Sequence, residues 1–128
     1  MSSQIRVSAL VNAANGAEIT KSTLASGTAV YSKPINAARS DGYAFLDMVL
    51  SSTPDVDISY EISYGDPDKT GWRTPYDTDG NNVGVLATAL VADRLIVFEP
   101  VACEWIRFNI DPDSESIVSA VYGHKETI

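Results

Sequence analysis

The stretch "VDISYEISY", residues 56–64, decides the fold. Every second residue in it is apolar, in the order Val56, Ile58, Tyr60, Ile62 and Tyr64. Successive side chains of a β-strand point to opposite faces of the sheet, so this alternation predicts a strand with one buried side. A helical arrangement would scatter the five apolar residues around its circumference.

Other short segments resemble this one. We expect strands over residues 43–50, 94–100, 104–110 and 116–123, each bounded by Gly, Pro, Ser or Asp turn residues. In "EWIRFNI", the inward set is Ile106, Phe108 and Ile110, whereas Trp105 and Arg107 belong to the outward set.

Three further segments carry weaker patterns. Residues 5–11 alternate, and residues 28–35 read as an edge strand because Pro34 cannot donate to a ladder. Residues 83–92, "VGVLATALVA", fit a strand or a short helix equally well.

Seven or so short strands predict an all-β protein, an antiparallel β-sandwich of the jelly-roll or immunoglobulin-like kind. We expect the sandwich domain to span residues 28–128. The small and polar residues 1–27 are expected to form an N-terminal arm outside it, with a strand at 4–11.

The composition excludes several classes of function. A chain of 128 residues fits one domain, and its net charge of −8 argues against a nucleic-acid partner. The single cysteine, Cys103, excludes an intrachain disulfide. We find no signal-peptide pattern and no run of the ~20 apolar residues that a membrane helix needs. We therefore expect a soluble protein made in a cytoplasm, with no membrane partner.

The loop of residues 65–82, "GDPDKTGWRTPYDTDGNN", contains many Asp and Asn side chains, whose oxygen atoms are typical calcium ligands. Asp77, Asp79 and Asn81 match the start of an EF-hand loop, with an oxygen ligand at every second position. Asn82 then stands where that loop needs Gly, and Thr88 stands where it needs a bidentate Glu. We expect ordinary turns here, with no metal and no cofactor.

Two aromatic residues of the same loop, Trp72 and Tyr76, lie beside several carboxylates, a combination typical of carbohydrate platforms. The alternative, which we favour, is that Trp72 begins a strand and packs across the end of the sandwich. Together with the outward-facing Trp105 and Arg107, these residues form the candidate ligand or partner surface.

The sequence offers no evident set of catalytic residues. The only histidine, His124, lies where chain ends tend to fray, and Cys103 has no evident base partner. Asp57 and Glu61 share one strand face, but four residues separate them by roughly 13 Å, beyond the ~5–9.5 Å that glycosidases use. We expect a protein that is not an enzyme.

Read in order, the chain carries "VYSKPI", "DGYAFLDMVL", "VDISYEISYG", "IVFEPVACEWIRFNI" and "SIVSAVYGH". Over about residues 28–124 this series resembles small β-sandwich proteins encoded among the structural genes of tailed bacteriophages and prophages. The shared elements are structural rather than catalytic.

The resemblance implies a virion component, such as a capsid decoration or cement protein, or a minor head or tail protein. It implies assembly in the host cytoplasm, a contact with the major capsid protein or another virion protein, and a homo-oligomer, with a trimer favoured. The alternative is a carbohydrate-binding module that uses Trp72, Tyr76 or Trp105. An accessory domain of a host enzyme is a third reading.

Overall fold

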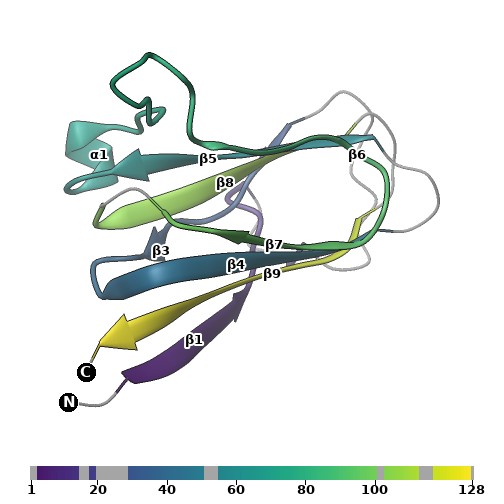
Figure 1. Ribbon diagram of the computed structural model, residues 1–128, viewed down its shortest axis with the longest axis horizontal. Coiled ribbons are helices and arrows are strands. Elements are labelled where there is room, and N and C mark those ends of the chain that lie inside the picture. The colour runs from purple at the N-terminus through teal and green to yellow at the C-terminus, as the bar shows by residue number, and fades with distance from the viewer. Residues whose placement is uncertain are drawn as a thin grey trace.

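The computed structural model describes residues 3–14, 18–19, 29–50, 55–100, 103–112 and 117–127. Over these ranges the chain forms two antiparallel sheets that pack face to face (Figure 1). The predicted all-β fold, an antiparallel β-sandwich, is confirmed.

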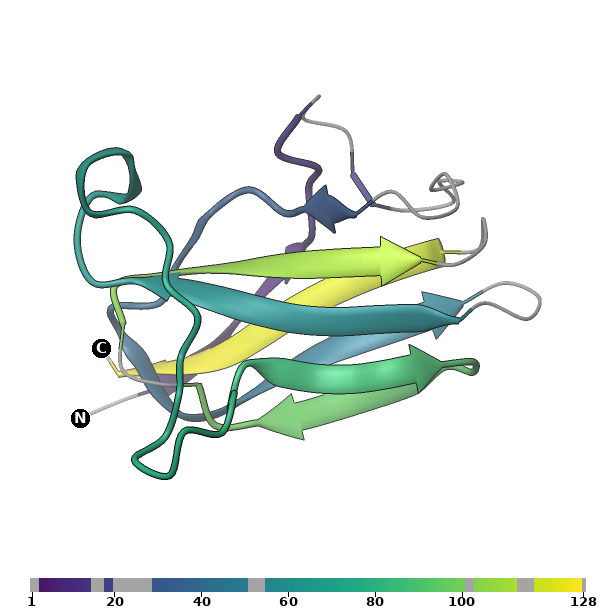
Figure 2. The ribbon, with the colours of Figure 1, turned by 90° about the horizontal axis from the view of Figure 1, so that it is seen from above.

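The first sheet contains, in spatial order, β1 (Ser3–Ala9), β9 (Ile117–Thr127), β4 (Ser40–Leu50) and β7 (Arg94–Phe98). The second sheet has the order β2 (Val30–Tyr31), β8 (Trp105–Pro112), β5 (Val56–Ser63) and β6 (Val85–Leu90). The short strand β3 (Ile35–Asn36) also pairs with β8. A four-residue helix, α1 (Pro67–Thr70), follows β5 at the end of the sandwich where β9 ends (Figures 1 and 2).

The alternation in β5 is confirmed from Val56 to Tyr60 and fails at the end of the strand, where Ser63 is buried and Tyr64, beyond the strand, is 71% exposed. Val56, Ile58 and Tyr60 are buried, and the inward set of β8 meets them in register, from Ile58 opposite Ile110 to Ile62 opposite Ile106. Four aromatic rings pack at the centre with centroids 5.3–6.5 Å apart, namely Tyr60, Phe98, Phe108 and Tyr122. Trp105 and Arg107 face outward, as expected.

The ambiguous segments are resolved by their neighbours. Within residues 83–92 the chain forms strand β6, because it pairs with β5. Residues 29–35 do not form one continuous edge strand. β2 ends at Tyr31, Ser32 still donates its backbone N–H to Phe108 O at 2.9 Å, and the strand pairing with β8 resumes at Ile35, beyond Pro34, which has no N–H to donate. The turns expected at 51–55 and 111–115 lie mostly outside the described residues, because residues 51–54 and 113–115 are not described.

The described part of the N-terminal region does not form an arm outside the sandwich. β1 pairs with β9 along its whole length, from Ser3 opposite Thr127 to Ala9 opposite Val121. Leu10, directly after β1, is buried in the core. Ile19 is buried as well, whereas residues 4–8 are exposed, and most of residues 12–27 lie outside the described ranges.

Candidate functional site

A cluster of aromatic and charged side chains lies on the outer face of the second sheet. The Arg107 guanidinium, on β8, lies over two rings, 4.1 Å from the centroid of Tyr31 on β2 and 4.7 Å from that of Trp72. Both distances are within the ~6 Å over which a cation is attracted to the face of an aromatic ring. The guanidinium thus shares contacts with two rings that are distant in the sequence.

Glu61 completes this group, which we call the Arg107 cluster: Tyr31, Glu61, Trp72 and Arg107. Glu61 lies opposite Arg107 in the β5–β8 register. Its Oε1 accepts from Arg107 Nη2 at 2.8 Å and from Nε at 3.0 Å, and each side chain is 23% exposed. Because the carboxylate and the two rings contact the same guanidinium, the cluster is ordered before any partner arrives.

The chain that follows α1 carries Trp72 to this face. The hydroxyls of Ser63 and Thr70 hydrogen-bond at 2.7 Å, which ties the end of α1 to the end of β5. Arg73 then exchanges two backbone hydrogen bonds with Ile62, each 2.9 Å. Trp72 is therefore held beside β5, half-buried and outside any strand, rather than starting a strand as we expected.

The structure brings two of the four predicted site residues together, Trp72 and Arg107. Trp105 lies on the same outer face of β8, half-buried, beside Asn36 of β3. Tyr76 is exposed further along the loop, where its backbone pairs with that of Asn82.

Sequence reasoning missed Tyr31 and the role of Glu61. Tyr31 had no distinguishing signal, since it lies in the weakly patterned segment 28–35. The sequence marks Glu61 only as half of a carboxylate pair with Asp57. Glu61 and Arg107 both belong to the outward-facing sets of their strands, so the sequence indicates this contact if β5 and β8 are neighbours.

Two hollows flank the Arg107 cluster. One, of about 440 Å³, lies beside Tyr31 and Arg107 and is lined otherwise by small residues: Asn12, Ala13, Ala14, Ala29 and Val30. The other, of about 270 Å³, crosses the outer face of β5, β6 and β8, and its polar lining includes Asp57, Ser59, Asn82, Thr88, Asn109 and Asp111. In the second hollow the buried Oδ1 of Asn109 has no hydrogen-bond partner among the described residues.

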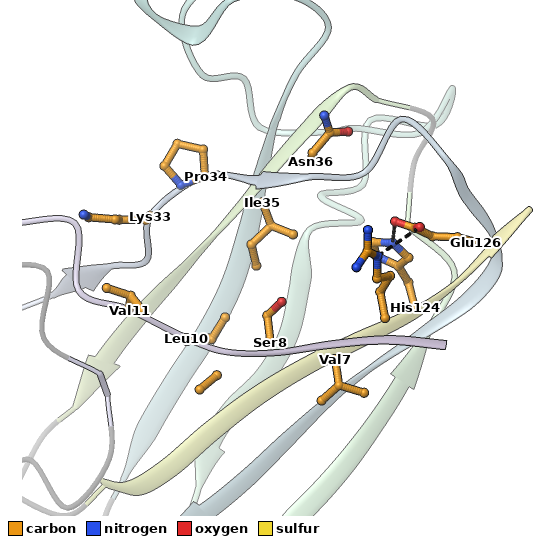
Figure 3. A pocket seen from close by; sticks show the side chains of 12 residues that line it. Val7, Ser8, Leu10, Val11, Lys33, Pro34, Ile35, Asn36, His124 and Glu126 are labelled. Carbon is orange, nitrogen blue, oxygen red and sulfur yellow. Dashed lines mark hydrogen bonds and ion pairs between the residues drawn. The ribbon is translucent and has the colours of Figure 1, made fainter. Parts of the chain in front are cut away.

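A third depression, a cleft of about 430 Å³, separates β1 from the segment that contains β3. Figure 3 shows His124 and Glu126 at one end of this cleft, with Lys33 at the other. His124 is only 3% exposed, and its Nε2 lies 3.0 Å from Glu126 Oε1 while its Nδ1 lies 3.0 Å from the Tyr122 hydroxyl.

The expectation that His124 lies in a frayed chain end is wrong, because β9 pairs with both β1 and β4 there. The hydrogen bond from His124, together with Arg6 at 3.2 Å, lowers the pKa of Glu126. Both ring nitrogens of His124 have hydrogen-bond partners, Tyr122 and Glu126. Through Glu126, this network of side chains also includes Arg6 of β1.

The aspartate-rich loop uses its carboxylates on its own backbone. Asp77 Oδ1 accepts from the backbone N–H groups of Asp79 and Asn81, both at 2.9 Å, and the hydrogen bond from Asn81 lowers the Asp77 pKa. This is the turn chemistry expected of aspartate. Over the described ranges, no three His, Cys, Asp or Glu side chains are grouped as metal ligands would be. In the same ranges no helix has the length and apolar character to span a membrane.

No protein-family model matches this chain, and no curated protein matches it either.

Proposed function

We propose that this chain is a non-enzymatic structural protein of a tailed-phage virion, a capsid decoration or cement protein or a minor head or tail component, which acts through protein–protein contacts. The Arg107 cluster is the observation that carries this proposal. Arg, Tyr and Trp are the side chains that most often dominate the binding energy of protein interfaces. Here one of each lies in a single ordered group on an outer face.

The hollow beside the cluster supports the same use. Its lining is mostly small and apolar, so it offers space for an apolar side chain of a partner next to an arginine whose charge is already balanced by Glu61. An anchor residue in a pocket, surrounded by polar groups, is the usual arrangement at the centre of a protein interface. We infer that the partner is the major capsid protein or another virion protein, in a particle assembled in the host cytoplasm.

The test is co-sedimentation of the purified protein with phage particles that lack it. We expect the wild type to pellet with the particles, and Arg107→Ala or Trp72→Ala to weaken binding by at least about tenfold, as for a residue that dominates an interface. Arg73→Ala is the matched control, since Arg73 is an exposed arginine directly beside Trp72. Wild-type protein that stays in the supernatant, or Arg107→Ala protein that binds like the wild type, would contradict the proposal.

A second candidate function is carbohydrate binding, and the polar hollow of the second sheet favours it. Asn109 Oδ1, which has no hydrogen-bond partner within the described part of the chain, would accept a hydrogen bond from a sugar hydroxyl, beside a row of carboxylates and hydroxyls. Against it, Trp72 and Tyr31 each already have the Arg107 guanidinium over the ring, which occupies the surface that a sugar would stack on. Glycan-array binding that is lost in Asn109→Ala and retained in Arg107→Ala would favour this candidate.

A further inference from the structure

The outer face of the first sheet is apolar from one edge strand to the other. The β1–β9–β4–β7 register places Val7, Gly123, Phe45 and Val97 in one row across it. The neighbouring row contains Ala9, Val121, Asp47 and Leu95. Of the eleven large apolar side chains found exposed among the described residues, five lie on this face: Ile5, Val7, Tyr43, Leu95 and Val97.

The edge strand β1 is oriented with its apolar side outward. Ile5 and Val7 are 61% and 59% exposed, whereas Arg6 and Ser8 share the side of His124 and Tyr122. In Figure 3, Ser8 points into the cleft and Val7 points away from it. An amphipathic strand normally turns its apolar side to the interior, so a second surface is needed to cover Ile5 and Val7.

The two sheets differ in this respect. On the outer face of the second sheet, β5 and β8 carry the polar residues Asp57, Ser59, Glu61, Arg107 and Asn109, with the aromatic residues Tyr31, Trp72 and Trp105 around them. Contact with water therefore explains the polar residues on the outer face of the second sheet. It does not explain why the outer face of the first sheet is apolar. Exposed apolar side chains that are contiguous on one face are a feature of interaction sites.

The charges on the apolar face indicate what covers it. Besides its apolar residues, the described part of this face carries the acid Asp47 and the base Lys125, and Asp41 is exposed at the start of β4. Val121 lies opposite Asp47 and is four residues from Lys125 on the same strand, which corresponds to ~13 Å. The row through Gly123 and Phe45 lies midway between them.

A two-fold axis along that row, lying between two such faces, brings Asp47 of each copy close to Lys125 of the other. An isologous interface requires this self-complementarity, in which residue i meets residue j and residue j meets residue i. We propose that two copies of this chain pair through the outer faces of their first sheets, with the Asp47 and Lys125 charges paired across the two-fold axis. This goes beyond the proposed function, and it gives the expected homo-oligomer two copies in place of the favoured trimer.

The test is the oligomeric state of the full chain, measured by sedimentation equilibrium over a concentration series. We expect a dimer for the wild type. Val97→Asp should raise the dissociation constant by at least about 100-fold, because it buries an unpaired charge in the apolar face. Val97 is 60% exposed in the single chain, so the variant should fold, which its circular dichroism melt will show.

The charge pair is tested by reversal. Asp47→Lys and Lys125→Asp should each weaken the dimer by at least about tenfold, and the double variant should recover most of the loss, as a direct pair requires. Asp111→Lys, on the outer face of the second sheet, makes the same change in net charge as Asp47→Lys and should leave the dimer intact.

A wild type that is monomeric at every concentration, a trimer, a dimer that survives Val97→Asp, or a double variant that stays dissociated would overturn the inference. Particle binding separates the two proposals. A monomer that pellets with particles through Arg107 supports the proposed function and contradicts the dimer. A dimer that does not pellet supports the dimer and contradicts the proposed function.

Discussion

The ring of Phe45, on β4, lies over Gly123, its register partner on β9. It fills the space that a side chain at position 123 would need, since a Cβ placed there overlaps the ring. Aromatic residues often cover a cross-strand glycine in this way, and here the pair sits at the centre of the apolar outer face. The absence of a side chain at 123 is therefore a packing requirement.

The first prediction follows from this pair. Gly123→Ala forces the Phe45 ring to move, so we expect it to lower the free energy of unfolding by about 1–3 kcal/mol, the usual effect of overpacking. Urea denaturation measures this change. In a Phe45→Ala background the same substitution should have a much smaller effect, and an equal effect in both backgrounds would contradict the explanation.

The second prediction concerns the core. Ile58 and Phe108 are fully buried at the interface of the two sheets. Replacing either by Ala leaves a cavity, so we expect a loss of about 2–5 kcal/mol in the free energy of unfolding. Val85→Ala, at an exposed position of β6, is the control and should lose less than about 1 kcal/mol. Core variants that unfold at the wild-type urea concentration would show that the inward face is assigned incorrectly.

The third prediction is a dependence of stability on pH. The pKa of Glu126 is lowered below 4.5 in the folded protein, first by its hydrogen bond with His124 and also by Arg6. A carboxylate with a lowered folded pKa stabilises the protein above its unfolded pKa, and this contribution disappears as the pH falls through the folded value. Glu126→Gln should therefore lower the melting temperature at neutral pH and lose less stability than the wild type on acidification.

Glu104→Gln serves as the control for that experiment, because Glu104 is an exposed carboxylate outside the His124 network. It should follow the wild-type profile. If Glu126→Gln and Glu104→Gln give the same profile, the network does not contribute to stability.

The fourth prediction concerns Cys103. Burial raises the pKa of its thiol to about 11, so almost none of it is thiolate at neutral pH. The thiolate is the reactive form, and we expect the folded protein to react with an aromatic disulfide reagent at pH 8 at least about tenfold more slowly than the urea-unfolded chain. The rate should rise with pH up to about 11. Equal rates for folded and unfolded protein would refute this.

The fifth prediction concerns the Arg107 cluster in the isolated protein. Arg107 and Glu61 are mostly shielded from solvent, so a double-mutant cycle of Arg107→Ala and Glu61→Ala should give a coupling energy of about 1 kcal/mol. Arg107→Lys should retain part of the charge interaction and lose most of the stacking on Tyr31 and Trp72, because the ammonium lacks the planar fork. Additive effects in the cycle would mean that the ion pair is not formed in solution.

The sequence by itself determined the fold class and the composition of the core. The alternation in residues 56–64 and 104–110 predicts two strands and assigns each side chain to one of two faces, because the side-chain period of a strand is two residues. That is why the inward position of Ile106, Phe108 and Ile110 and the outward position of Trp105 and Arg107 were both predictable. The turns around Asp77 were predictable for a similar local reason, since an aspartate can cap the backbone of its own loop.

Only the tertiary structure decided which strands are neighbours, and the candidate site depends on this. Tyr31 and Glu61 meet Arg107 because β2 and β5 lie on either side of β8. His124 is held firmly because β9 lies between β1 and β4.

Strand β1 shows most clearly that the local sequence does not decide how strands pair. Its alternation identifies an apolar side, but a period of two does not say which side faces the interior. That choice is made by the pairing of Arg6 with His124 and of Ser8 with Tyr122, which leaves Ile5 and Val7 outside. A shift of one residue in that register would reverse both faces, so the exposed apolar surface of the first sheet is a property of long-range strand pairing and not of the local sequence.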